Sequence, residues 1–499
     1  MELQFQKNII SCMRPIAREV QNQELTQEVR LTDGMPDIGK ILACWGQVLI
    51  RSKEWHSGNV GVSGGVMAWV LYEPEEGGAV QSMATWLPFQ MKWDIPETQR
   101  DGTMQVHGLL RGMDARSISA RKIMLRAGVG IMAEAMVPGD VEIYYATECP
   151  EDVQLLKNTY PINIPVEAGE KAFVIDEAIS LPESSPAIQR LVRYELIPEV
   201  QEQKVISDKV VFRGIGKLHI LYLSADGKLC SLDMQLPFSQ YAQLDKEHSP
   251  ESSAKICLAM TNLELEQGEE ENLNLKAGLI GQYVIFDEQI IEMTEDAYCN
   301  FRDVKLHFSE ASIPVCLECR TETVTARQSA QLGNVSCVDL SFAPDHPQLY
   351  REGDTVTGEM SGVFQMLYYD ENDLLSSDTF RWEEEWTTVA SQKSKMFAML
   401  QLAGNPKISY SADNLLLECD MERQVTAVAK EPLSMIAQLE LGDVKEPDLD
   451  RPSLILRKPG NASLWELAKY AGSTVEAIQK ANKLQQEPSE DQMLIIPIC

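Results

Sequence analysis

A strand pattern that ends in the dipeptide Leu-Tyr occurs three times, and it constrains the fold more than any other feature of the chain. The dipeptides are Leu71-Tyr72, Leu221-Tyr222 and, in a weaker copy, Leu367-Tyr368. Before each tyrosine, every second residue is small or apolar. Side chains alternate between the two faces of a β-strand, so a period of two predicts a strand with one buried face. The sequence therefore predicts at least three similar sheets.

The first two copies share further landmarks at a nearly constant offset. Pro36 and Pro186 open them, and these prolines lie 150 residues apart. Leu87-Pro88-Phe89 and Leu236-Pro237-Phe238 close them, at an offset of 149 residues. The third copy lacks both landmarks, so it is either a diverged repeat or a related sheet with different edges.

Each copy continues into a turn and a second strand, which is the pattern of a β-hairpin. The turns are Glu75–Gly78, Ala225–Lys228 and Asp370–Asp373. A lone hairpin is marginally stable in water, so further strands must complete each domain. The candidates are Leu109–Leu125, Val141–Thr147, Lys255–Leu265, Gly281–Met293, Met396–Leu402 and Leu415–Ala427. We predict a mainly β protein with three β-rich, sandwich- or barrel-like repeat domains at residues 1–150, 151–300 and 301–440.

Charge and composition exclude several classes of protein. The net charge of −31 argues against a nucleic-acid or anionic-membrane partner, because both would be repelled. No apolar run is long enough to span a membrane, and the first residues lack the apolar core of a secretory signal. Eleven scattered cysteines are typical of reduced, buried thiols. We therefore expect a cytoplasmic protein without membrane insertion.

The end of the chain differs from the rest. Residues 441–452 are acidic and lack periodicity, which is typical of a linker. From Arg451 on, six basic and five acidic residues give +1, which leaves −32 for the body. This uneven charge indicates separate roles for the two parts, or only a solubility effect in the body. Residues 453–499 predict a βααβ order, with helices at Leu464–Tyr470 and Val475–Asn482 and a closing strand at Met493–Pro497.

The βααβ segment resembles the LysM family. The matching residues are Lys458, Gly460, Leu464, Trp465, Val475, Ile478, Asn482, Gln492, Leu494, Ile496 and Pro497. The resemblance implies that two loops line a groove for N-acetylglucosamine-containing glycans, although the first loop is one residue longer than usual and lacks the family's aspartate. The candidate residues for binding a partner or a glycan are Gly460, Asn461, Ala462, Ser463, Leu464, Trp465, Asn482, Lys483, Leu484 and Gln485. For Leu464, Trp465 and Asn482, a purely structural role is the competing interpretation.

The body has a resemblance of its own. The run from Pro186 through Tyr222 to Phe238 resembles the SPOCS domain of clostridial spore-envelope proteins, as does the run from Pro36 to Phe89. SPOCS repeats followed by one LysM module are the layout of SipL-type proteins. The resemblance implies a non-enzymatic scaffold or adaptor of spore-coat assembly, which docks through LysM onto the morphogenetic ATPase stage IV sporulation protein A and also meets other coat proteins. It implies a place in the mother-cell cytoplasm, at the outer forespore surface. The alternative is a protein that binds peptidoglycan in the cell wall or spore cortex.

Catalytic patterns are not evident in the sequence. Cys316-Leu317-Glu318-Cys319 is the best metal candidate, but residues three apart on a strand point to opposite faces. The glutamate runs 383–385 and 269–271 are typical of solvated turns or edges. The chain has no P-loop and no H-E-x-x-H motif. We predict no catalytic residue, no metal and no cofactor.

Overall fold

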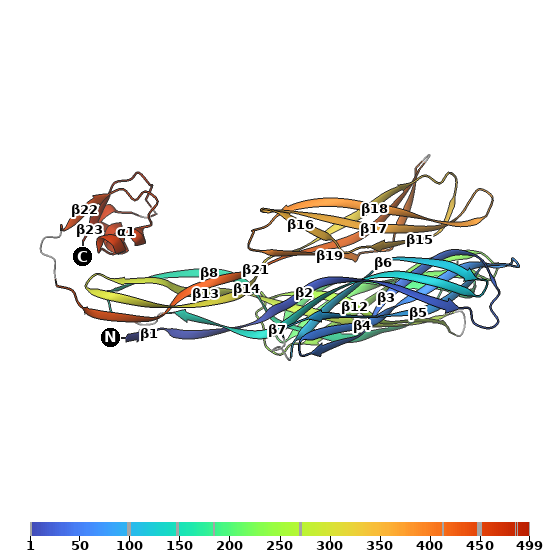
Figure 1. Cartoon of the computed structure of the whole chain (residues 1–499), viewed down its shortest axis with the longest axis horizontal. Helices are drawn as coiled ribbons and strands as arrows, with labels where there is room; N and C mark the ends of the chain where they lie inside the picture. Colours follow the sequence, from blue (N-terminus) through green and yellow to red (C-terminus); the bar gives the residue numbers. More distant parts are fainter. Residues whose placement is uncertain are drawn as a thin grey trace.

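The computed structural model describes residues 2–96, 101–145, 149–182, 185–268, 272–411, 414–446, 452–484, 486 and 488–498. Over these residues the protein is mainly β, with two short helices near the C-terminus, which confirms the predicted fold class. None of the described helices is long and apolar enough to cross a membrane. Figure 1 shows an elongated molecule, with a thick bundle of sheets at one end, a thinner stalk at the other and the helical module beside the stalk.

The strands of the body fall into three successive units with the same order. Each unit begins and ends with a very long strand, and between the two lie a three-stranded meander and one or two further strands. The first unit contains β2 (Gln6–Arg30), β3 (Ile38–His56), β4 (Asn59–Pro74), β5 (Gln81–Asp94), β6 (Thr103–Ser119) and β7 (Lys122–Tyr145). The second contains β8 (Val153–Ile179), β9 (Ile188–Ile206), β10 (Lys209–Ser224), β11 (Leu229–Gln243), β12 (Ser253–Gln267) and β13 (Leu273–Cys299). The third contains β14 (Arg302–Ala330), β15 (Ser336–Pro344), β16 (Gln348–Glu352), β17 (Thr355–Tyr369), β18 (Leu375–Val389), β19 (Lys395–Leu402), β20 (Lys407–Ser411) and β21 (Asn414–Val444).

Each unit is a sandwich of two antiparallel sheets. In the first unit the sheets have the orders β2-β7-β6 and β3-β4-β5, and in the second β8-β13-β12 and β9-β10-β11. In the third, β14-β21 with β19 and β20 faces β17, which pairs with β15, β16 and β18. Apolar residues of both sheets meet in one core per unit; Tyr72 on β4 and Val129 on β7 both belong to that of the first. The alternation seen in the sequence is the inward face of the middle strand, β4, β10 or β17.

The long strands continue beyond the sandwiches as two-stranded ribbons that form the stalk (Figure 1). Each first strand carries one extra residue, Ile16, Val166 or Leu317, at the corresponding place. Such a bulge bends a strand, and here it marks the passage from sandwich to ribbon. The three ribbons pack against one another around one core of alternating apolar side chains. These are Ile10, Cys12, Val141, Ile143, Ile162, Ile164, Ile291, Met293, Ile313, Val315, Leu433 and Met435.

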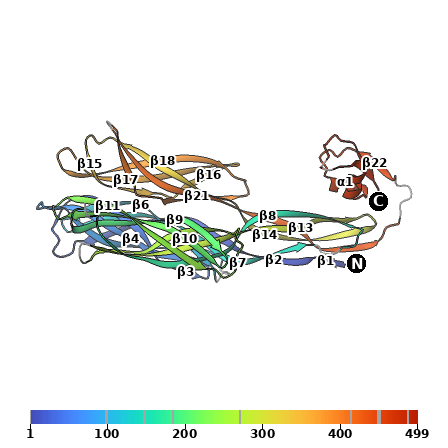
Figure 2. The same ribbon diagram turned by 180° about the vertical axis from the view of Figure 1, so that it is seen from behind.

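The sandwiches also share a core with one another. Leu71, Leu221 and Leu367 meet there, whereas the adjacent tyrosines point into the cores of their own units. Each unit therefore touches the other two both in the stalk and in the sandwich bundle. Figure 2 shows the same close bundling from behind. A short strand, β1 (Glu2–Gln4), pairs with β21 and joins the start of the body to its end.

Three details differ from the sequence expectations or add to them. The expected strand Leu109–Leu125 is wrong, because the chain turns at Ala120-Arg121 between β6 and β7; no Gly, Pro or Asn marks this turn. The Arg121 side chain holds it through bonds to Met35 O and Asp37. The third unit follows the order of the others, but its first meander strand is split into β15 and β16. β21 reaches Val444, which lies within the expected linker, and residues 447–451 of that linker lie outside the described residues.

Candidate functional site

The C-terminal module folds as β22 (Leu454–Arg457), α1 (Leu464–Ala471), α2 (Val475–Asn482) and β23 (Leu494–Pro497). Ser463 caps α1: its Oγ accepts from Glu466 N, and Glu466 Oε2 accepts from Ser463 N at 2.8 Å. Gly472 ends α1 in the left-handed conformation, and Thr474 caps α2. The module thus has the predicted βααβ order.

One face of the module lies against the stalk, close to the end of β13. Asp296 accepts a hydrogen bond from Trp465 Nε1 at 2.8 Å and pairs with Lys469 Nζ at 2.7 Å. The Tyr298 ring meets the Trp465 ring edge-on at a centroid distance of 4.8 Å, and its hydroxyl donates to Ser473 O at 2.9 Å. A register shift between Thr294 and Asp296 breaks the ladder at this point, which aims Asp296 toward the module. The second unit therefore supplies a docking site for the module.

The structure places the candidate binding residues in different surroundings. Leu464 is buried in the module core, Trp465 lies in the contact with the stalk, and Asn482 ties α2 to β23 through bonds to Ile495 N and O. Ala462 and Leu484 are partly buried against the same core, so the two loops are neighbours. Gly460, Asn461, Ser463 and Lys483 are exposed. Gln485 lies outside the described residues, and the role of these loops in binding stays a prediction.

Sequence reasoning missed an exposed apolar surface on the same module. We call it the strand face, and it consists of Leu454, Leu456, Met493 and Ile495, which are 39–68% exposed. Leu456 lies directly opposite Ile495 in the β22–β23 pair, and the helices cover the other side of this sheet. A polar face would be expected where a two-stranded sheet meets water. The sequence could have revealed this surface, because the runs Leu454–Leu456 and Met493–Ile496 are continuously apolar and do not alternate with polar residues.

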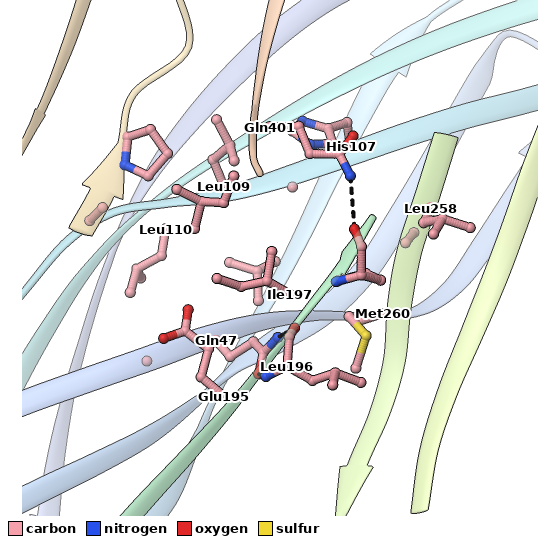
Figure 3. Close-up of a pocket in the computed structure, with 18 of the residues that line it drawn as sticks. Gln47, His107, Leu109, Leu110, Glu195, Leu196, Ile197, Leu258, Met260 and Gln401 are labelled. Carbon is pink, nitrogen blue, oxygen red and sulfur yellow. Dashed lines mark hydrogen bonds between the residues drawn. The ribbon is translucent and has the colours of Figure 1, made fainter. Parts of the chain in front are cut away.

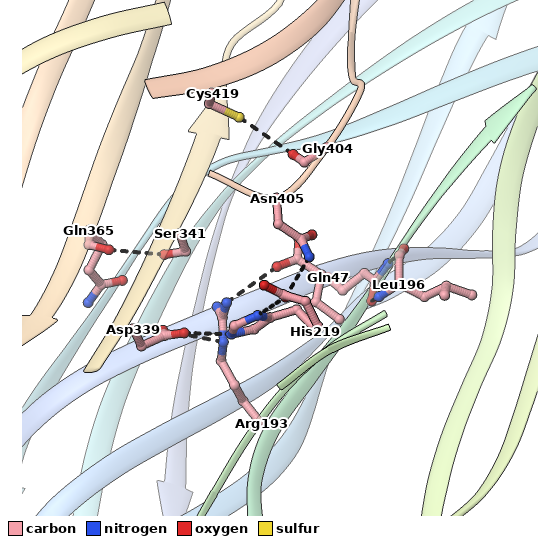
Figure 4. A network of polar contacts seen from close by, with 12 residues as sticks. Gln47, Arg193, Leu196, His219, Asp339, Ser341, Gln365, Gly404, Asn405 and Cys419 are labelled. Atoms are coloured by element: carbon pink, nitrogen blue, oxygen red, sulfur yellow. Dashed lines mark hydrogen bonds and ion pairs between the residues drawn. The ribbon is translucent and has the colours of Figure 1, made fainter. Parts of the chain in front are cut away.

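A polar network joins the second and third units (Figure 4). His219 on β10 lies between two carboxylates, with Nε2 2.6 Å from Asp339 Oδ1 and Nδ1 2.7 Å from Asp233 Oδ1. Burial lowers the pKa of His219, but these two hydrogen bonds outweigh it and raise the pKa to about 9. Arg193 Nε lies 3.5 Å from Asp339 Oδ2, so the buried aspartate meets two cationic groups. Carboxylates occupy both ring nitrogens of His219, which suits a structural clamp and not a general base.

A small cavity lies where the three sandwiches meet (Figure 3). Its volume is about 130 Å³, and Gln401 Nε2 crosses it to donate to Pro198 O at 3.1 Å. Burial lowers the pKa of His107 in its wall to about 3, so this imidazole is neutral. The cavity is smaller than the ~300–1,000 Å³ of typical ligand sites, and we interpret it as a packing gap between units.

The described residues offer little to nucleophilic or metal chemistry. Burial raises the pKa of the Cys44 and Cys337 thiols to about 12 and that of Cys316 to about 11, so these groups stay protonated and unreactive. Cys316 is buried and Cys319 is exposed. No group of three or more His, Cys, Asp or Glu residues within the described ranges is arranged to hold a metal ion. Glu383–Glu385 lie on β18, and residues 269–271 are outside the described part.

The architecture defines a class of protein: tandem β-sandwiches joined by a shared stalk and followed by a small βααβ module. Comparison with known protein families narrows this class further for two parts of the chain. Residues 37–117 and 187–266 match the family model described as SipL, SPOCS domain. These segments contain the meander and the strand after it in the first and second units, β3–β6 and β9–β12. No curated protein and no solved structure matches the chain.

Proposed function

We propose that this protein is a non-enzymatic adaptor of bacterial spore-envelope assembly, which docks onto a spore morphogenetic protein through its C-terminal module. The two SPOCS-domain matches support the link to sporulation. In this proposal the partner is an ATPase like stage IV sporulation protein A, and other coat proteins bind the acidic body. The protein then works in the mother-cell cytoplasm, at the outer forespore surface and in the coat.

The strand face is the observation that carries the docking proposal. Leu456 is 68% exposed and Leu454 59%, on an element of only four residues. Exposed apolar side chains that cluster in this way are typical of a protein interface, whereas scattered ones need no explanation. Glycan recognition depends instead on hydrogen-bonding groups beside aromatic rings, and Trp465 already contacts the stalk.

The contact with the stalk leaves the strand face available. Among the described residues, the module reaches the stalk through Trp465, Lys469 and Ser473, which lie on α1 or just after it. The strand face is on the other side of the β22–β23 sheet from the helices. A partner could therefore bind the module while the module stays fixed to the body, and the two would form one rigid assembly.

The test measures binding of the purified partner ATPase to the immobilised full-length chain. Leu456→Asp combined with Ile495→Asp should weaken binding about tenfold or more, because a charge in the centre of an apolar interface removes a hot spot. Gln479→Asp is the matched control, since Gln479 is exposed on α2, away from the strand face, and should leave binding unchanged. Removal of residues 452–499 should abolish binding while the body stays folded.

Retained binding after removal of residues 452–499 would show that the module is not the docking element. The glycan alternative has its own readout. If the full-length chain sediments with purified peptidoglycan, and Asn461→Ala with Lys483→Ala prevents it, the predicted loops bind glycan and the alternative is favoured.

A further inference from the structure

A partly open cavity that all three units line lies at the junction between sandwiches and stalk. We call it the junction cavity; its volume is about 390 Å³. Its lining includes one proline from each unit, Pro15, Pro165 and Pro314; the first two directly precede the bulges at Ile16 and Val166, and Pro314 lies three residues before the one at Leu317. The volume falls in the range of small-molecule sites, about 300–1,000 Å³. It is three times that of the cavity between the sandwiches.

Positive charge collects around the junction cavity, although the chain as a whole carries −31. Its lining contains five cationic side chains and one acid, Glu134. Arg18 lies 3.6 Å from Glu134 and neutralises it. No ion pair within the described residues involves the side chains of the other four cations, Lys255, Lys393, Lys395 and Lys430. The cavity therefore has a surplus of positive charge that the protein itself does not compensate.

Among these four cations Lys255 is the buried one, because Lys393, Lys395 and Lys430 are exposed. Lys255 is only 9% exposed, and burial lowers its pKa; nearby Arg18 acts in the same direction and Glu134 in the opposite one. A buried ammonium group without a partner is costly, so proteins rarely keep one that serves no purpose. The corresponding position of the first unit is Gln105, opposite Glu134 on β7, and Phe397, opposite Thr426, occupies it in the third. The buried lysine is thus specific to β12 of the second unit and is not repeated at the equivalent positions of the other two units.

Three further donors in the lining lack partners. Arg18 Nε, Gln105 Nε2 and Thr426 Oγ1 are buried and have no hydrogen-bond partner among the described residues. Gln105 and Thr426 are each 5% exposed. An unsatisfied buried polar group is costly, so three around one cavity indicate that something else satisfies them.

The remaining walls are apolar. Met136, Val284, Phe286 and Val315 contribute to them. Phe397 lies beneath the Arg18 guanidinium, 4.1 Å from ring centroid to Cζ, which holds that side chain in place. A small inorganic anion would satisfy the cations and leave these walls unused, whereas a neutral apolar molecule would leave the cations and donors unpaired.

We propose that the junction cavity binds a small organic anion with an apolar body. Its acidic group accepts hydrogen bonds from Lys255, Arg18 and Gln105, and its apolar body packs against Met136 and Phe286. The site is built from all three units, so the bound anion also ties the sandwiches to the stalk. This inference is independent of the docking role of the C-terminal module.

Isothermal titration calorimetry on the full-length chain with three probes tests the proposal. Octanoate, which has both features, should bind. Octanol lacks the charge that would pair with the cations, and sulfate lacks the apolar body that would contact the apolar walls, so each should bind at least about tenfold more weakly. Lys255→Met should weaken octanoate binding by a similar factor. Lys204→Met, an exposed lysine on β9 outside the cavity, should leave it unchanged.

Three outcomes would overturn the proposal: no heat with octanoate at millimolar concentration, octanol binding as tightly as octanoate, or sulfate binding as tightly as octanoate. The second would indicate a merely apolar cavity and the third an unspecific cation cluster. Lys255→Met removes a buried charge, so its unfolding temperature should be no lower than that of the parent chain. If the variant nevertheless fails to fold, Gln105→Leu serves as the binding variant, with the same expected loss.

Discussion

At the scale of single residues, the Leu-Tyr dipeptide has two functions in two adjacent positions. Tyr72, Tyr222 and Tyr368 fill the cores of their own sandwiches, and the preceding leucines fill the core between units. Successive side chains of a strand point to opposite faces of its sheet. One dipeptide therefore contributes to both cores only because the meander sheet of each unit is buried on both faces at this point. The repeated dipeptide therefore reflects packing between the units as well as folding within each unit.

The His219 clamp leads to a pH prediction. Its pKa in the folded protein is about 9, above its ordinary value of 6.5, so the stabilisation is fully present below pH 6.5 and is lost as pH rises through 9. The shift corresponds to about 3 kcal/mol. Urea unfolding of the parent chain should become easier between pH 6.5 and 9, and His219→Gln should lower stability at pH 6 and flatten that slope. An unchanged slope in the variant would contradict the clamp.

At the scale of elements, two glycines explain why the third unit diverges. A Cβ on Gly64 would collide with Leu49 O, and one on Gly214 with Glu199 O, where the neighbouring strand bulges toward them. The third unit has Met360 at the corresponding position, eight residues before its tyrosine. There the neighbouring strand is interrupted between β15 and β16, which removes the close approach. The third unit can therefore hold a methionine at this position because its neighbouring strand is split there.

Gly64→Ala should therefore destabilise the protein by about 1–3 kcal/mol, since the backbone must shift to relieve the overlap. Gly112→Ala is the matched control, because a Cβ there meets nothing within 4 Å. Thermal unfolding followed by circular dichroism compares the two. Equal effects in both variants would show that the close approach does not matter.

Local patterns predicted the elements well and their partners poorly. The capping residues Ser463 and Thr474 placed both helices of the module nearly to the residue, because caps act within one turn. The stalk was not foreseen, although Ile162 and Ile164 alternate as strand residues should, since their partners lie in other units. The contact of Trp465 with Asp296 was missed for the same reason.

At the scale of the whole molecule, the three units behave as one body. Each contributes residues to the stalk core and to the core between the sandwiches, so no unit can unfold without exposing apolar surface of the others. The junction cavity lies between these two shared cores. Three units with nearly the same order of strands thus form a single body.

Ile164→Ala tests this coupling. Ile164 is fully buried in the stalk core and belongs to the second unit, which contains no tryptophan. The substitution should cost about 2–5 kcal/mol and should shift the urea transition seen by tryptophan fluorescence, although the fluorophores lie in other parts of the chain. Ile290→Ala, on the same ribbon but 78% exposed, should have almost no effect. An unshifted fluorescence transition in Ile164→Ala would mean that the units unfold independently.

The long strands also set the order of events during synthesis. Gln6 pairs with Tyr145, Val153 with Cys299 and Arg302 with Val444, so each first strand leaves the ribosome well before its partner exists. Contacts between such distant residues slow folding, because a long loop must close first. The stalk adds a further delay, since its core needs Leu433 and Met435 from the last strand. We expect the first two units to wait with exposed ribbon edges until the third is made, a stage at which the growing chain depends most on protection from aggregation.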